Sequence, residues 1–398
     1  MIMTYRFPEK LQRTSRNLIL EVAERGRTIP GFISFAMGNP AMETIPVELM
    51  RECVQEAFAD DPMAVLQYGP MTGEKALMDW IRNRLVGQKG FPAEGNQIIL
   101  LSGSGKGLGL VPRTLCGEGD EAYCDRFCFP NATASMMNVG AVPVGIPMDD
   151  EGMIPEALEE KAKSGKGTYI YLIPNFHNPM GTTISHRRRK ELYEVASKYD
   201  LMIYEDDPYG EIRFAGEEIP SFKSMDTEGR VIYAGSFSKT LSAGLRAGYL
   251  YAPDAVAKKL AAVKVADGQE PLLNQKIIAK CLTKMDYDTH IRTISRVYGR
   301  KCRLMAEGLQ EHCSARCRIL VPEGGMFVWV ELPEDVSVDD VSEAAIRAGV
   351  GVVKSAAFAV DAACPGNAVR LNFSALPDEQ IVKGVEIFGK VTRAFCDK

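Results

Sequence analysis

The sequence has little of several features on which other protein classes depend. Only 4 histidines and 2 tryptophans occur among 398 residues, and the four histidines show no arrangement of a nucleophile with a histidine base. No apolar run is long enough to cross a bilayer, and the first residues lack the apolar core of a secretory signal. We therefore expect no membrane segment and no histidine-dependent hydrolytic site.

Charge and cysteine usage exclude further classes. The formal net charge is −5, and the densest basic run, at 187–190, is predicted to be the solvated face of a helix. We therefore expect no nucleic-acid partner. The 10 cysteines include two pairs that lack the spacing of a zinc site, Cys124/Cys128 and Cys313/Cys317. They are predicted to be buried or half-buried thiols, not metal ligands, and together with the missing signal they favour a cytoplasmic location.

Short apolar strands alternate with amphipathic helices from about Ile45 to about Val265. Strands are expected at 97–101, 121–124, 141–146, 169–173, 201–204, 230–234 and 248–251. Helices are expected at 73–90, 105–115, 155–163 and 186–199. This alternation predicts an α/β domain with a mostly parallel sheet between helices.

A different pattern follows in the last third of the chain. A helical stretch at 274–310, interrupted near Asp286, leads into strands at 326–331 and 369–373 with a helix at 338–348. This arrangement predicts a smaller C-terminal α+β domain. We therefore predict an N-terminal arm with part of the small domain at 1–45, a large domain at 46–285 and the small domain at 286–398.

The strongest local motif is the string GSFSKT at 235–240, which directly follows a predicted strand and precedes Arg246. Lys239, among small and hydroxyl residues, is suited to Schiff-base chemistry in a site that desolvates its amine. Ser236, Ser238 and Arg246 would supply two hydroxyls and a guanidinium for a phosphate. The alternative interpretation is an exposed lysine in an ordinary loop.

Two further motifs also follow predicted strands. Asp206 and Tyr209 lie in YEDDPYG, where a carboxylate could keep a pyridine nitrogen protonated and a tyrosine could bond a phenolic oxygen. Asn178 lies in NFHNPMG, where the following proline favours an extended backbone that presents the amide to a ligand. Plain turns and loops are the alternative interpretation of both strings.

The string SGSGKG at 102–107 lies between a predicted strand and a predicted helix, where backbone amides form an anion site. It is not a nucleotide P-loop, because position 100 is leucine and Gly107 stands where that motif needs serine or threonine. Arg370, inside an apolar strand, needs an anionic partner. That partner would be either a substrate carboxylate or a structural carboxylate.

These motifs, in this order, resemble those of the fold-type I pyridoxal-phosphate enzymes. From ISFAMG at 33–38 to RLNFS at 370–374, the chain is most similar to class I/II aminotransferases of the aminoadipate and kynurenine type, and SFSKTLSAGLRAGYL is the most specific string. The resemblance implies pyridoxal 5′-phosphate as cofactor, an L-amino acid and a 2-oxo acid as substrates, and a homodimer.

The resemblance also implies a role for each matching residue. Lys239 would form the Schiff base, Asp206 would pair with the pyridine nitrogen, and Asn178 and Tyr209 would bind the phenolic oxygen. The phosphate would be held by Ser104, Gly105, Ser236, Ser238, Arg246 and, from the neighbouring subunit, Tyr68. Phe129 would stack on the ring, and Gly38, Asn178 and Arg370 would hold the substrate.

The chain departs from the family pattern at three places. The phosphate loop has Gly105 and Lys106 where the family often has two glutamines, Phe129 replaces a common tyrosine, and the loop from Met37 to Pro46 differs from the usual form. These departures leave the substrate open. A lyase or decarboxylase would use the same residues. An amino-acid-sensing regulator is a further alternative, against which stand the acidic charge and the short stretch before Ile33.

Overall fold

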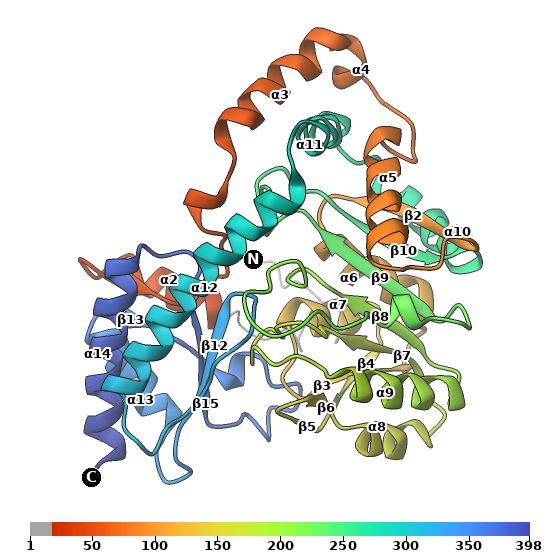
Figure 1. Cartoon of the computed structure of the whole chain (residues 1–398). Coiled ribbons are helices and arrows are strands. Elements are labelled where there is room, and N and C mark those ends of the chain that lie inside the picture. Colours follow the sequence, from red (N-terminus) through yellow and green to blue (C-terminus); the bar gives the residue numbers. More distant parts are fainter. Residues whose placement is uncertain (1–17) are drawn as a thin grey trace, which may run out of the picture.

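The computed structural model describes residues 18–398, and its largest element is a seven-stranded sheet (Figure 1). The strand order is β2 (Asn96–Leu101), β10 (Gly248–Pro253), β9 (Val231–Ser236), β8 (Met202–Asp206), β7 (Gly167–Leu172), β3 (Glu121–Asp125) and β4 (Val142–Ile146). All neighbours are parallel except β10, which is antiparallel to both β2 and β9. The predicted mostly parallel sheet is confirmed.

Helices cover both faces of this sheet because alternate strand residues point to opposite sides. On one side Tyr171 and Tyr204 share a core with α6 (Gly105–Leu115), α7 (Pro130–Asn138) and α10 (Asp254–Lys264). On the other side Ile170 and Ile203 share a core with α8 (Pro155–Ala162) and α9 (His186–Lys198). Both faces are thus removed from water, which explains the nearly continuous apolar runs of the strands.

A second, four-stranded antiparallel sheet lies in the C-terminal part. Its order is β11 (Arg318–Leu320), β12 (Phe327–Glu331), β15 (Ala368–Asn372) and β14 (Val353–Lys354), and α13 (Val338–Arg347) and α14 (Asp378–Cys396) pack nearby. The long helix α12 (Tyr287–His312) leads into it from α11 (Leu272–Lys284) (Figure 1).

The segment before the large sheet returns to this C-terminal part. After α2 (Leu18–Gly26), strand β1 (Ile33–Ser34) pairs in parallel with β13 (Val350–Gly351). These two strands form a separate two-stranded sheet, and the division of the chain into domains stays a prediction. Residues 1–17 of the predicted arm lie outside the described residues.

Several elements differ from the sequence-based expectations. The predicted helix at 73–90 is α5 (Lys75–Arg82) followed by a wider π-helical stretch, η2 (Asn83–Gln88), and short strands β5 (Met148–Asp149) and β6 (Gly152–Met153) form a small hairpin. The solvated face predicted for the basic run is wrong for two of its members. Arg188 and Arg189 are buried, because Arg188 pairs with Asp149 and Arg189 donates to backbone carbonyls and Asn175.

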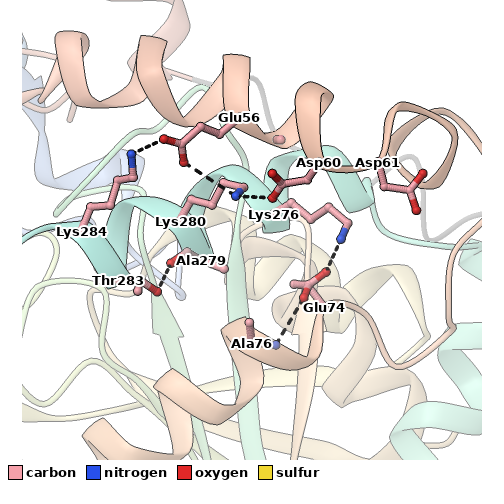
Figure 2. Close-up of a pocket in the computed structure, with 11 residues that line it drawn as sticks. Glu56, Asp60, Asp61, Glu74, Ala76, Lys276, Ala279, Lys280, Thr283 and Lys284 are labelled. Carbon is pink, nitrogen blue, oxygen red and sulfur yellow. Dashed lines mark hydrogen bonds and ion pairs between the residues drawn. The ribbon is translucent and has the colours of Figure 1, made fainter.

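Helix α3 (Val47–Asp60) and the short α4 (Pro62–Leu66) stand at the outer end of the molecule, beside α11 (Figure 1). Figure 2 shows the pocket of 320 Å³ between them, where lysines of α11 face carboxylates of α3. Lys280 contacts Asp60 at 2.6 Å and Lys284 contacts Glu52 at 2.6 Å. These ion pairs hold one face of α3 on α11 and leave its opposite face uncovered.

No helix within residues 18–398 has the length and apolar content that crossing a membrane requires.

Candidate active site

Three of the motif residues meet at one edge of the large sheet. Asn178 follows β7, Asp206 is the last residue of β8, and Lys239 follows β9. Because β7, β8 and β9 are adjacent and parallel, their carboxyl ends lie at the same edge, where open α/β sheets bind ligands. Topology therefore gathers side chains that are 61 residues apart in the sequence, from 178 to 239.

Lys239 is half-buried, and its Nζ donates to the carbonyl oxygen of Gly38 at 2.7 Å. Burial lowers the pKa of its amine to about 8, and the positive charges of Arg246 and Arg370 act in the same direction. A lysine amine with a pKa near neutrality is a usable base and nucleophile, which an exposed lysine is not. The environment of Lys239 therefore differs from that of an exposed lysine in an ordinary loop, which was the alternative interpretation of this motif.

Asp206 is buried beneath the same edge. The hydroxyl of Tyr171 donates to its Oδ2 at 2.9 Å, whereas Oδ1 has no hydrogen-bond partner among the described residues. Burial raises the pKa of this carboxyl to about 7, although the bond from Tyr171 acts to lower it. A buried carboxylate oxygen without a partner is costly and is typical of a site that a ligand completes.

An anion cradle forms where β2 passes into α6. Ser104 immediately precedes α6 and Gly105 begins it. The amides of Lys106 and Gly107 donate to the carbonyls of Gly103 and Ser104, whereas the amides of Ser104 and Gly105 donate to no backbone carbonyl outside α6 within residues 18–398. Arg246 reaches the loop with Nη2 on the carbonyl of Ser102 at 3.3 Å and places Nη1 3.4 Å from Ser238 Oγ. Gly103 has φ +85°, and a Cβ there would lie 2.5 Å from Nη2 of Arg246.

Ser236 completes this cradle from β9. Its Oγ accepts from the backbone amide of Ser238 at 3.1 Å, so the turn before Lys239 is held by its own hydroxyl. The predicted phosphate residues of the chain itself therefore lie around one loop.

Arg370 approaches from the smaller sheet. Its Nη1 donates to Asn178 Oδ1 at 2.8 Å and its Nη2 donates to the carbonyl of Ala36, whereas its Nε has no hydrogen-bond partner in the described part of the chain. Within residues 18–398 no ion pair joins Arg370 to a carboxylate. The alternative of a structural salt bridge therefore does not apply to these residues. The guanidinium lies 4.3 Å from the ring centroid of Phe327 and 4.8 Å from that of Phe358.

Tyr209 lies beside this arginine. It is buried, its ring meets Phe327 edge-on at 5.9 Å, and burial raises the pKa of its hydroxyl. Its hydroxyl also interacts with the side chain of Asn178. The structure thus brings Tyr209, Asn178 and Arg370 together.

Two predicted residues are not gathered in the same way. Tyr68 follows α4 and is 90% exposed, so it does not reach the site of its own chain. Phe129 directly precedes α7 and is half-buried, packed against the core of the large sheet. Gly38, in contrast, touches Lys239 through its carbonyl, and a side chain there would meet the ring of Phe327.

Sequence reasoning missed two sets of residues. Tyr171, the partner of Asp206, was not among the predicted site residues. Tyr171 of β7 is in register with Tyr204 of β8, and the two-residue period of β8 puts Asp206 on the same face as Tyr204. The buried contact of Asp125, the last residue of β3, with His177, in the loop after β7, is also not indicated by the sequence, because the two residues are 52 positions apart.

Comparison with known proteins identifies the family of this chain. The model of the family described as "Aminotransferase class I and II" matches residues 30–388. A curated relative, the aromatic-amino-acid aminotransferase 1 of Thermococcus litoralis, is 37% identical over 89% of this chain and 86% of its own length.

Two solved structures are similar over nearly the whole chain. The kynurenine aminotransferase of Pyrococcus horikoshii, in complex with PMP, superimposes with a TM-score of 0.92 at 32% identity, covering 98% of this chain and 97% of that chain. The α-aminoadipate aminotransferase LysN of Thermus thermophilus, complexed with N-(5'-phosphopyridoxyl)-L-leucine, superimposes with a TM-score of 0.87 at 30% identity, covering 98% and 97%.

Proposed function

Since the chain belongs to the class I and II aminotransferase family and transfers amino groups with pyridoxal phosphate, we propose that its amino donors include aromatic L-amino acids and that Lys239 and Arg370 are its central site residues. The observation that carries the proposal is the buried guanidinium of Arg370, which has no carboxylate partner within residues 18–398 and lies within 4.8 Å of the centroids of two phenylalanine rings.

The residues present fit the cofactor. The free Oδ1 of Asp206 matches a protonated pyridine nitrogen, and the cradle of Ser104, Ser238 and Arg246 matches a phosphate. When bound, pyridoxal phosphate supplies an electron sink for the carbanion that forms at the donor's α-carbon. Asn178 and Tyr209 would face its phenolic oxygen.

Lys239 would move the protons. With a pKa of about 8, a substantial fraction of its amine is neutral near that pH, so it could accept the proton from the donor's α-carbon and deliver it to the C4′ carbon of the cofactor, which lies on the other side of the amino nitrogen. The carbonyl of Gly38, 2.7 Å from Nζ, would hold the amine in place between these two transfers. A cationic partner would favour the carboxylate form of the buried Asp206, whose pKa is raised to about 7, and this carboxylate would keep the pyridine nitrogen protonated.

Arg370 would bind the α-carboxylate of the donor. Its remaining N–H groups suit a planar carboxylate, and Asn178 fixes the orientation of the guanidinium. The rings of Phe327 and Phe358 make the surroundings of this cation apolar and aromatic. This environment, together with the names of the relatives from Thermococcus and Pyrococcus, supports a donor with an aromatic side chain.

The test is a half-reaction with a panel of donors. Cofactor-loaded protein is mixed with phenylalanine, tyrosine, kynurenine, 2-aminoadipate, leucine, glutamate or alanine without an acceptor, while the visible band is followed. We expect the fastest loss of the band with aromatic donors and one equivalent of 2-oxo acid per site. Lys239→Ala should show no such loss. A preference for alanine or glutamate would refute the donor class, and continuous ammonia release would indicate a lyase.

We also propose a homodimer. The uncovered face of α3 carries Val47, Val54 and Phe58, which we call the α3 apolar face, and the following segment exposes Leu66 and Tyr68. Positions 47, 54 and 58 lie on one side of a helix, and a contiguous exposed apolar face is typical of a subunit interface. A second copy docked here would bury this face and could receive Tyr68 at its phosphate cradle.

A cytoplasmic location completes the proposal. The cysteines within residues 18–398 are all free thiols, and Cys124, Cys128 and Cys313 are buried while Cys317 is half-buried, as predicted. Free thiols are the usual state in a reducing compartment.

A further inference from the structure

A buried contact between an aspartate and a histidine lies beside the site. Neither residue has been given a role in the reaction above. His177 Nε2 is 3.4 Å from Asp125 Oδ2, and both side chains are 4% exposed. The other carboxylate oxygen, Asp125 Oδ1, is buried without a hydrogen-bond partner among the described residues. Burying a carboxylate that is this poorly satisfied is costly, so its presence here calls for a physical explanation.

The surroundings of the ring determine which nitrogen carries the proton. The backbone amide of Met180 donates to His177 Nδ1 at 3.5 Å, so Nδ1 is an acceptor. In a neutral ring the proton then lies on Nε2 and points toward Asp125. Backbone bonds fix the same residue, because its amide donates to the carbonyl of Thr182 at 2.8 Å and its carbonyl accepts from Gly181 at 2.6 Å.

Both ends of this contact lead to the same guanidinium. On one side, the residue after His177 is Asn178, whose Oδ1 accepts from Arg370 at 2.8 Å. On the other side, Asp125 ends β3 and continues into Cys128, whose backbone amide donates to the carbonyl of Phe358 at 2.8 Å. The ring of Phe358 lies 4.8 Å from the guanidinium of Arg370.

The chain therefore forms a closed loop around Arg370. One branch runs through the Asn178 amide and the other through the Phe358 ring, and the two branches are joined at their base by Asp125 and His177. Two loops that carry site residues would shift independently without this contact, and a small displacement of a substrate-binding group is costly to a reaction.

We propose that Asp125 and His177 are a positioning pair that fixes the orientation of Arg370 toward the carboxylate of the substrate. Neither residue touches the reacting atoms. The pair acts through Asn178 and Phe358, and its assignment rests on the proposed role of Arg370 as the carboxylate-binding residue.

The test compares His177→Phe with His177→Gln in cofactor-loaded enzyme. Phenylalanine fills the space but has no N–H for Asp125, whereas the glutamine amide places an N–H near the position of Nε2. We expect His177→Phe to raise the KM for the amino donor about tenfold, with a much smaller change in kcat, because bound carboxylate is held less well. His177→Gln should restore most of the KM. Equal kinetics of the phenylalanine variant and the wild type would overturn the proposal.

Two controls separate this outcome from loss of folding and from failure of the proposed function. His186→Phe removes the exposed histidine that begins α9 and should leave KM unchanged. Arg370→Ala tests the underlying role: an unchanged KM in this variant would refute the proposed function itself. A raised KM in Arg370→Ala with an unchanged KM in His177→Phe would refute only the positioning pair.

A second readout does not depend on activity. The chain has only 4 histidines, so the ring nitrogens of ¹⁵N-labelled, cofactor-free protein can be resolved by NMR, with His177→Gln identifying the signal. We expect the tautomer with its proton on Nε2 and a change in that signal in Asp125→Asn. A proton on Nδ1, or no response to Asp125→Asn, would contradict the contact on which the proposal depends.

Discussion

The buried amine of Lys239 should make the stability of the cofactor-free chain depend on pH in a specific direction. Its pKa is about 8 in the folded chain instead of 10.5, because burial and the charges of Arg246 and Arg370 disfavour the ammonium form. The unfolded chain therefore binds more protons between these two values. Below pH 8 the folded chain holds a charged amine at a cost of about 3 kcal/mol, and this cost disappears as the pH rises toward 10.5.

Lys239→Met isolates this contribution. The variant lacks the bond to the Gly38 carbonyl at every pH. It also avoids the cost of the charged amine, but this second effect is present only at low pH, where the wild-type amine is protonated. The free energy of unfolding of the variant, relative to that of the wild type, should therefore be larger at pH 7 than at pH 10 by about 2 to 3 kcal/mol, so that the variant gains relative stability at the lower pH. Urea unfolding of both cofactor-free proteins at pH 7, 8, 9 and 10 measures this difference.

The exposed Lys190→Met on α9 is the matched control for loss of a lysine. A difference between Lys239→Met and wild type that stays constant from pH 7 to pH 10 would refute the reasoning. The amine would then be charged throughout, and it could not serve as the base near neutral pH. The same experiment therefore tests the stability argument and the chemical role together.

Two further predictions concern other parts of the molecule. Asp206→Asn removes the buried charge that would hold the pyridine nitrogen protonated, so the half-reaction should slow by about 100-fold or more, as measured by stopped-flow absorbance; a rate within about threefold of the wild type would exclude that role. Phe58→Glu places a charge on the α3 apolar face and should shift the protein toward monomer in analytical ultracentrifugation, while Val382→Glu, at an exposed valine of α14, should not. A wild type that is monomeric at micromolar concentration would contradict the dimer.

Local pattern was sufficient for much of the fold. The strand preceding each motif was predictable because buried parallel strands are short, continuous apolar runs, and the structure has each within a few residues of its predicted position. Helices α3, α10 and α14 were not predicted. In α3 the apolar residues are mixed with many charges, such as those with which it contacts α11, so its sequence period is weak. In α14 the buried Ile381, Val385 and Phe388 recur at helical spacing, so this helix was readable from the sequence.

The candidate site was also partly readable from the sequence. Lys239, Asp206 and Asn178 each stand at or after the end of a strand, and a parallel sheet brings the ends of its strands to one edge. The solvated face predicted for the basic run at 187–190 was wrong because burial there depends on segments far away in the sequence. Whether Arg189 is solvated or buried depends on carbonyls at 184, 219 and 220 and on Asn175, which sequence neighbours do not reveal.

The sequence by itself thus determined the class of chemistry, because a lysine, a carboxylate and an anion-binding loop stand at strand ends that must converge. Only the tertiary structure decided the electrostatic state of these groups. The lowered pKa of Lys239, the free oxygen of Asp206 and the closed loop from Asp125 and His177 to Arg370 all arise from burial and from contacts between segments far apart in the chain. Desolvation and long-range packing depend on the whole fold, so no local string of residues encodes them.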